Sequence, residues 1–209
     1  DSIMATDARL TLQLGPGVQA RQAYKSSPEC ANLGVMEPDE QGEVSFIVGH
    51  IEREKTYEFL CEVVAPPREV GSLDVIFARL HYRVPGEADE LVEQEVCLSV
   101  DYVTAQQAES TQVDVELERD FREVTIVRLT EDLNAAERRG DHTQAMHVLH
   151  DLVDHCEKND NTGLQRRFET LMRTLDTQGR LSQETLNACL VASTTVKSDT
   201  AEPLYEVHL

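Results

Sequence analysis

The sequence lacks tryptophan and is poor in aromatic and basic residues. Only 5% of its 209 residues are aromatic, and 19 lysines and arginines stand against 39 aspartates and glutamates, a formal net charge of −20. Nucleic-acid-binding proteins gain affinity when basic side chains displace counterions from phosphates, so a chain this acidic predicts no nucleic-acid partner. An anionic membrane surface is disfavoured for the same reason. The acidity instead favours solubility and a protein partner of basic character.

Long apolar runs are also missing. The longest contain only a few residues, whereas about 20 are needed to cross a bilayer, so we expect no membrane insertion. The first ten residues, DSIMATDARL, have neither the basic start nor the apolar centre of a signal peptide. These features predict a cytoplasmic protein.

The cysteines are too widely spaced for a zinc site or a disulfide scaffold. Successive cysteines lie 31 or more positions apart, whereas a zinc site usually contains a close Cys-x-x-Cys pair. We therefore predict buried, reduced thiols of an intracellular protein, with a single structural disulfide as the alternative. The five positions are Cys30, Cys61, Cys97, Cys156 and Cys189.

The motifs of common catalytic sites are absent from the sequence. It contains no Gly-x-Ser-x-Gly elbow, no His-Glu-x-x-His and no phosphate-binding glycine loop. Glu93 and Glu95 share one strand face and could form an acid/base pair, but alternating glutamates on a solvent-facing edge are far more common. His50 and His81 lie among apolar strand residues, where a structural histidine is the better interpretation. We predict no catalytic residue and no cofactor.

The stretch Val44–Val64 organises the first half of the chain. Tyr57, Phe59, Cys61 and Val63 share one parity, while Glu58 and Glu62 lie on the other. This is the pattern of a half-buried strand, because successive strand side chains point to opposite faces. A charged tip precedes this run. The run before the tip alternates in the same way, at Val44, Phe46 and Val48. We interpret the stretch as a β-hairpin or as a connection between two sheets.

Turn residues divide the first half into about seven short strands. Gly15 and Gly17 flank a proline and are interpreted as turn glycines, not as a phosphate-binding loop. The spacing favours an antiparallel β-sandwich, with a small barrel as the alternative, and the absence of a Cys-Trp-Cys arrangement leaves an immunoglobulin domain unsupported. The strands are expected at Leu10–Leu14, Val18–Tyr24, Asn32–Met36, the two runs of Val44–Val64, Leu73–Arg83 and Glu90–Val103. In the strand Leu73–Arg83 the side chains expected to face inward are Ile76, Ala78, Leu80 and Tyr82. In the strand Glu90–Val103 they are Val96, Leu98, Val100 and Tyr102.

Beyond Val103 the apolar period changes to three to four residues, which predicts helices. The first, from Val113 to Arg139, would bury Val113, Leu117, Phe121 and Val124, although β-branched residues at 123–127 leave a strand as the alternative. Gly140 suits a C-cap and Asp141 an N-cap. Further helices are expected at Asp141–Cys156, Gly163–Leu175 and Ser182–Val191, and we expect two or three of these helices to form a small bundle. The predicted division is a β-sandwich at 1–103, a linker at 104–112, a helical domain at 113–191 and a tail at 192–209.

One cluster could bind a metal. His147, His150, Asp151 and Asp154 have the spacing i, i+3, i+4, i+7 and share one helix face, opposite the apolar stripe. Imidazole and carboxylate are ligands for zinc and other transition metals. The alternative is a solvated, histidine-rich face, which we favour because no pattern supplies a further ligand, and we predict no metal site.

Several segments resemble a region of bacterial von Willebrand factor A domain proteins. They are GHIEREKTYEFLCEVVAPP, VIFARLHYRVPGE and AAERRGDHTQAMHVL, within Ala8–Asp176. In that family a sandwich and a small helical bundle follow the A domain, and the helical joint often reads Gly-Asp before an Ala-x-x-x-Leu spacing. Gly140, Asp141, Ala145 and Leu149 match that joint.

The A domain itself is not in these residues. Its metal site needs an Asp-x-Ser-x-Ser turn, which the start Asp1-Ser2-Ile3-Met4-Ala5 does not supply. The resemblance therefore implies a non-catalytic structural and protein-interaction module, with a protein partner that includes an adjacent A domain. The alternative function is an enzyme or a metal-dependent binding module of an unrecognised type.

Overall fold

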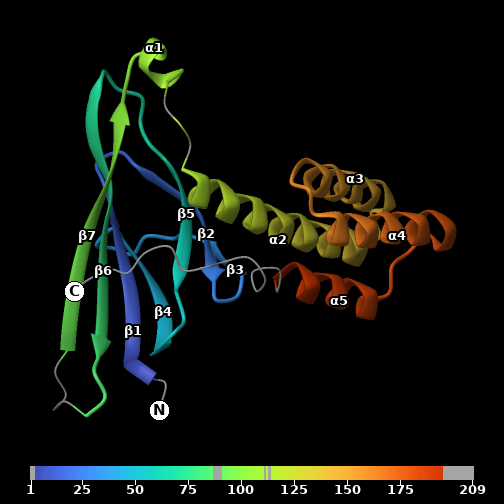
Figure 1. The fold of residues 1–209 in the computed structure, drawn as a ribbon, viewed down its shortest axis with the longest axis horizontal. Helices are drawn as coiled ribbons and strands as arrows, with labels where there is room; N and C mark the ends of the chain where they lie inside the picture. The colour runs from blue at the N-terminus through green and yellow to red at the C-terminus, as the bar shows by residue number, and fades with distance from the viewer. Residues whose placement is uncertain (1–2, 87–90, 111, 113, 195–209) are drawn as a thin grey trace. The chain divides into compact units, whose positions relative to one another are not determined.

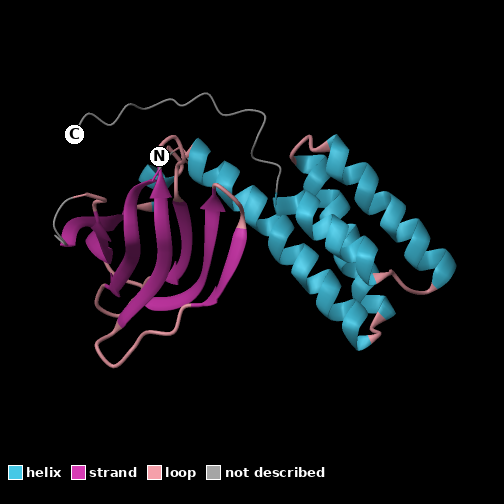
Figure 2. Cartoon of the chain, turned by 90° about the horizontal axis from the view of Figure 1, so that it is seen from below, coloured by secondary structure: helices cyan, strands magenta, loops and turns pink. Residues whose placement is uncertain are grey.

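The computed structural model describes residues 3–86, 91–110, 112 and 114–194. Their contacts divide the chain into two compact units, Asp1–Ala23 with Leu33–Val113 and Tyr24–Asn32 with Asp114–Leu209. Figure 2 distinguishes the strands, most of them in the first unit, from the helices. The division at residues 103 and 112 stays a prediction. No described helix is both long and apolar enough to span a bilayer.

Two sheets contain the seven strands of the described residues (Figure 1). The four-stranded sheet has the order β4-β1-β6-β7 and pairs its strands antiparallel, and the three-stranded sheet has the order β3-β2-β5. The strands are β1 (Ile3–Leu14), β2 (Gln19–Ser27), β3 (Ala31–Val35), β4 (Glu43–Glu52), β5 (Glu58–Val64), β6 (Gly71–Arg83) and β7 (Leu91–Tyr102).

The stretch Val44–Val64 connects the two sheets, because β4 and β5 belong to different ones. The hairpin interpretation was wrong. The rings of Phe46 on β4 and Phe59 on β5 stack with their centroids 6.3 Å apart. In the first run Val44, Phe46 and Val48 are more buried than the residues between them, so the predicted alternation is confirmed there. In the second run residues 57–61 are all half-buried, so the predicted alternation holds only toward its end, at residues 61–64. At the tip, the Tyr57 hydroxyl donates to the His50 carbonyl oxygen at 3.0 Å, which holds the connection without a strand ladder.

One apolar core is shared by strands of both sheets. A bulge in β6 adds to it, because the register with β7 shifts between Asp74 and Ile76 and leaves Val75 as the extra residue. Consecutive residues Val75 and Ile76 are thereby both buried, which strict alternation would forbid. The buried members of this core are Leu12, Val18, Ala23, Met36, Val44, Leu73, Val75 and Ile76.

The predicted inward face of the last strand is mostly exposed. Val96, Leu98 and Val100 on β7 are 56%, 50% and 40% exposed. The prediction was wrong because β7 is the edge of a four-stranded sheet, while the opposing sheet has only three strands. Tyr102, at the end of β7, is half-buried and its hydroxyl donates to the Pro66 carbonyl oxygen at 2.6 Å.

Helices dominate the second unit. They are α2 (Val115–Arg139), α3 (His142–Lys158), α4 (Thr162–Gln178) and α5 (Gln183–Thr194), and a single-turn helix α1 (Ala105–Ala108) lies in the predicted linker. Gly140 ends α2 in the left-handed conformation and Asp141 caps α3, as predicted. Four helices share one core, more than the two or three expected, since Leu186 and Cys189 of α5 join it.

The first turns of α2 depart from the prediction. The chain is helical through residues 123–127, so the strand alternative was wrong, and Val124 is buried as expected. Leu117 and Phe121, however, are 52% and 57% exposed, and Val113 lies outside the described residues. The His155 ring near the end of α3 contacts the Arg122 carbonyl oxygen at 2.9 Å. The turns of α2 before Arg122 therefore extend beyond α3 and are not covered by it.

A segment from the β-rich half packs with the helices. In Tyr24–Asn32, the fully buried Ser26 donates to the Asp120 carboxylate at 3.1 Å, and the Asn32 side-chain amide donates to Glu131 at 2.6 Å. Both acceptors lie on α2. These long-range polar contacts explain why this segment groups with the helical unit and not with the neighbouring strand residues.

Candidate functional site

The histidine-rich face of α3 is where the sequence placed it. His147, His150, Asp151 and Asp154 are all exposed, on the side opposite the buried Leu149 and its neighbours. Among the described residues no group of three or more histidine, cysteine, aspartate or glutamate side chains has the geometry to hold a metal. Exposed ligands along one helix lack the convergence that a zinc site requires, and the absence of a metal site on this face stays a prediction.

Glu93 and Glu95 each pair with a side chain on β6. Glu93 lies 2.6 Å from His81 Nε2 and Glu95 lies 3.5 Å from Arg79, in both cases across the β6–β7 ladder. Arg79 also donates a hydrogen bond at 2.6 Å to the Glu43 carboxylate on β4. Cross-strand pairs of opposite charge stabilise a sheet. The two glutamates therefore form cross-strand polar pairs on the outer face of the sheet, each held by a separate partner on β6.

The two strand histidines differ. His81 is half-buried and has the carboxylate partner just described, which fits a structural role. His50 is exposed although its neighbours in the sequence are apolar, and its carbonyl oxygen accepts the bond from the Tyr57 hydroxyl. Gly15 and Gly17 lie in the turn between β1 and β2. Nothing in these positions assembles a reactive centre.

All five cysteines are free, so the disulfide alternative is wrong. Cys30, Cys156 and Cys189 are buried, as predicted, but Cys97 on β7 is exposed. Burial raises the pKa of Cys61, Cys156 and Cys189 to about 11. At neutral pH these three sulfurs are therefore protonated and poor nucleophiles.

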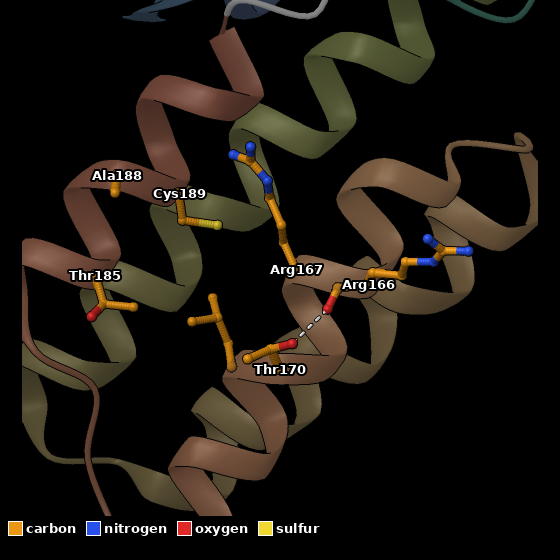
Figure 3. Close-up of a pocket in the computed structure, with 7 residues that line it drawn as sticks. Arg166, Arg167, Thr170, Thr185, Ala188 and Cys189 are labelled. Carbon is orange, nitrogen blue, oxygen red and sulfur yellow. Dashed lines mark hydrogen bonds between the residues drawn. The ribbon is translucent and has the colours of Figure 1, made fainter.

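A pocket of about 390 Å³ lies between α4 and α5. Figure 3 shows the Cys189 sulfur directed toward the side where Arg167 lies, while Arg166 extends away and its carbonyl oxygen accepts a hydrogen bond from Thr170 at 2.8 Å. Its described lining residues offer hydroxyls, a thiol and guanidinium groups but no carboxylate or imidazole. These residues therefore supply no general base for a nucleophile.

A second pocket, of about 490 Å³, lies between α2 and α5 and is more polar. Glu131 and Asp132 line it, but no hydroxyl or thiol does. Asn134 also lines it, and its side-chain oxygen is buried without a hydrogen-bond partner among the described residues. Like the first pocket, it does not join a nucleophile to a base.

The feature that best fits a binding role is the exposed apolar row on β7. We define this row as Val96, Leu98 and Val100, which follow one another on one face of the edge strand. Their partners on β6 are Ala78, Ile76 and Leu73, so the row continues the apolar core outward to the sheet edge. The sequence indicated that these residues share an apolar face, but no local signal could tell that the opposing sheet leaves them uncovered.

Comparison with known proteins gives a likeness in fold. No protein-family model matches the chain, and no curated protein matches it. Among solved structures, the chain is similar to von Willebrand factor type A from Catenulispora acidiphila, with a TM-score of 0.66 and 16% identity over 93% of this chain and 47% of that one. The ArnB paralog VWA2 from Sulfolobus acidocaldarius gives a TM-score of 0.45 and 15% identity over 92% and 43%. The first likeness shows that this chain has the fold of part of a von Willebrand factor A protein. The chain spans about half the length of the solved chains that it matches.

Proposed function

We propose that this chain is a non-catalytic structural and protein-interaction module, a β-sandwich followed by a helical bundle. It stands C-terminal to a von Willebrand factor A domain in a larger protein, and it acts by binding protein and not by chemistry. The observation that carries the proposal is the β7 row, in which the neighbouring side chains of Val96, Leu98 and Val100 are 40–56% exposed. This apolar row lies on the surface of a chain whose net charge is −20. Contiguous exposed apolar residues bordered by polar ones are typical of interaction sites.

The link to an A domain rests on the fold. The likeness to the Catenulispora protein includes 93% of this chain but only 47% of that one, which leaves room for another domain beside the shared region. The motif at the helical joint supports the same link, since Gly140 and Asp141 cap α2 and α3, and Ala145 and Leu149 are fully buried. Those residues thus have the packing role that the resemblance implies.

The proposed lack of catalysis rests on the chemistry of the described side chains. Glu93 and Glu95 are held by cross-strand contacts to His81 and Arg79, and three of the thiols are kept protonated by burial. The free state of all five cysteines also supports a reducing compartment, and we place the protein in a bacterial cytoplasm.

The coding sequence upstream of Asp1 tests the link to an A domain. We expect an Asp-x-Ser-x-Ser turn in the same reading frame, followed by the distant threonine and aspartate that complete the metal site. A frame that contains no such motif upstream would overturn this part of the proposal.

If the Asp-x-Ser-x-Ser turn is found upstream, binding between the A domain and this chain provides a second test. A pull-down of its A domain with this chain supplied separately should succeed equally with and without a chelator, because the chain is proposed to work without metal. Loss of the complex in chelator alone would assign the binding to the metal site of the A domain and not to this module.

A further inference from the structure

The edge strand β7 is unusually open to pairing. In the described sheet it pairs with β6 alone, and its 12 residues contain no proline, lysine or glycine. Natural sheets protect their edges with proline, with charged side chains, with bulges or with short strands, and of these β7 has only its acidic residues Glu93, Glu95 and Asp101. The strand at the opposite edge, β4, is irregular, because its register with β1 shifts three times and Gly49 has a φ of 84°. Such irregularities protect an edge from pairing with another strand. The two edges are therefore not equivalent, and β7 is the one that can accept another strand.

One side of β7 is apolar. A strand paired with β7 would align its own side chains with Val96, Leu98 and Val100 and extend the row across one more strand. Each exposed apolar side chain of the row would lose water contact, which stabilises association at about 25 cal/mol per Å² of buried apolar surface. The partner strand therefore needs apolar residues at alternate positions.

The other side of β7 is acidic. Glu93, Glu95 and Asp101 share this face, and Glu95 remains 66% exposed because Arg79 is nearer to Glu43, at 2.6 Å against 3.5 Å. Opposite charges directly across a ladder stabilise it and like charges destabilise it. The remaining alternate positions of the partner strand should therefore be lysine or arginine.

A second copy of this chain does not meet these needs. The described strand β7 contains no lysine or arginine, so in no register can a second copy set a basic side chain opposite Glu93, Glu95 or Asp101. In the antiparallel registers about Cys97 and about Gln94, acidic residues would face each other. Each copy also has a net charge of −20, which opposes self-association. The charge pattern favours a different, basic partner.

We propose that the free edge of β7 binds an extended segment of a partner protein in which apolar residues alternate with lysine or arginine. Main-chain hydrogen bonds to the open edge supply affinity, and the apolar row and the acidic face select the side chains. This inference rests on the proposed function only in that the chain acts by binding protein. An upstream A-domain motif does not bear on it, so the two can fail separately.

A peptide of alternating valine and lysine, with capped ends and one tryptophan, tests the proposal. The chain has no tryptophan, so the peptide fluorescence reports binding without background. We expect saturable binding that weakens as salt rises, and about tenfold or greater weakening by Leu98→Lys, which places a charge in the row. The matched control is Ile47→Lys on β4, where the side chain is 82% exposed, and it should leave the affinity within about twofold. An alternating valine–glutamate peptide should not bind.

Backbone N-methylation separates strand pairing from simple hydrophobic adsorption. Alternate N–H groups of a strand point to opposite edges. Methylating one alternate set should abolish binding to the wild-type chain, while methylating the other set should preserve it. Equal binding of the two methylated peptides, equal binding of the glutamate peptide, or a self-associated chain that Leu98→Lys turns into monomers would each overturn the proposal.

Discussion

At the level of single residues, Gly15 shows how closely the turn after β1 packs against β6. Its N–H donates to the Val75 carbonyl oxygen at 2.9 Å, and a Cβ at this position would lie 1.8 Å from the carbonyl oxygen of Asp74. The sequence predicted a turn here from the glycine–proline–glycine pattern. It could not predict the contact with β6, because that neighbour lies about 60 positions away in the chain.

We expect Gly15→Ala to destabilise the protein strongly, by about 2–4 kcal/mol in the free energy of unfolding, because two backbone segments would have to separate. Urea unfolding at equilibrium measures the change. Gly163→Ala, near the start of α4, is the matched control, since an added Cβ meets nothing within 4 Å there and alanine favours helix. A Gly15→Ala protein as stable as the Gly163→Ala protein would contradict the close approach seen here.

His155 links stability to pH. Burial lowers the pKa of His155 below its ordinary value of 6.5, and it outweighs the bond to the Arg122 carbonyl oxygen, which acts in the opposite direction. The folded state therefore binds this proton less readily than the unfolded state. Its contribution to stability is complete above the unfolded pKa and is lost as the pH falls through 6.5 toward the folded value.

We therefore expect His155→Gln to reduce the loss of unfolding free energy between pH 7.5 and pH 5.5. The wild-type chain is the reference for this comparison. Urea titrations at several pH values measure both. An unchanged slope in the His155 variant would show that burial of this ring does not couple folding to pH.

At the scale of elements, helix α3 was predictable in nearly every respect. Its apolar stripe, its Asp141 cap and its polar face are all local properties, set by residues three or four positions apart. Helix α2 was less predictable, because burial along it depends on where α3 ends and on the distant segment 24–32. The exposure of Leu117 and Phe121 could therefore not be read from their spacing.

The polar face of α3 gives a prediction about metal. Because the exposed His147, His150, Asp151 and Asp154 form no convergent group, zinc should not raise the midpoint of thermal unfolding. Differential scanning fluorimetry with and without zinc measures this. A rise in the midpoint that disappears in a His147→Ala, His150→Ala double variant would instead establish a zinc site on this face.

At the scale of the molecule, two separate cores stabilise the two units. The core around Phe168 and Leu152 belongs to α2–α5, the core around Leu12 and Val44 belongs to the sheets, and they have no residue in common. Each unit therefore has its own source of hydrophobic stabilisation.

Phe168→Ala should accordingly destabilise the helical unit first, by about 3–5 kcal/mol, because it leaves a cavity at a fully buried aromatic position. Native-state amide exchange should become faster in α2–α5 and change little in β1 and β6. Val44→Ala is the reciprocal control in the sheet core. Equal acceleration in both units after Phe168→Ala would show that they unfold as one.

Local sequence patterns were sufficient to place most strands and helices, the boundary between two helices at Gly140 and Asp141, and the shared face of Val44, Phe46 and Val48. These properties depend on backbone sterics and on neighbours within one turn or one strand, so the local sequence encodes them. Three features followed only from the folded chain: β4 and β5 belong to different sheets, residues 24–32 pack with helices, and β7 forms an uncovered edge. Those outcomes depend on which distant surfaces meet, and an apolar residue has the same local pattern whether or not another layer covers it.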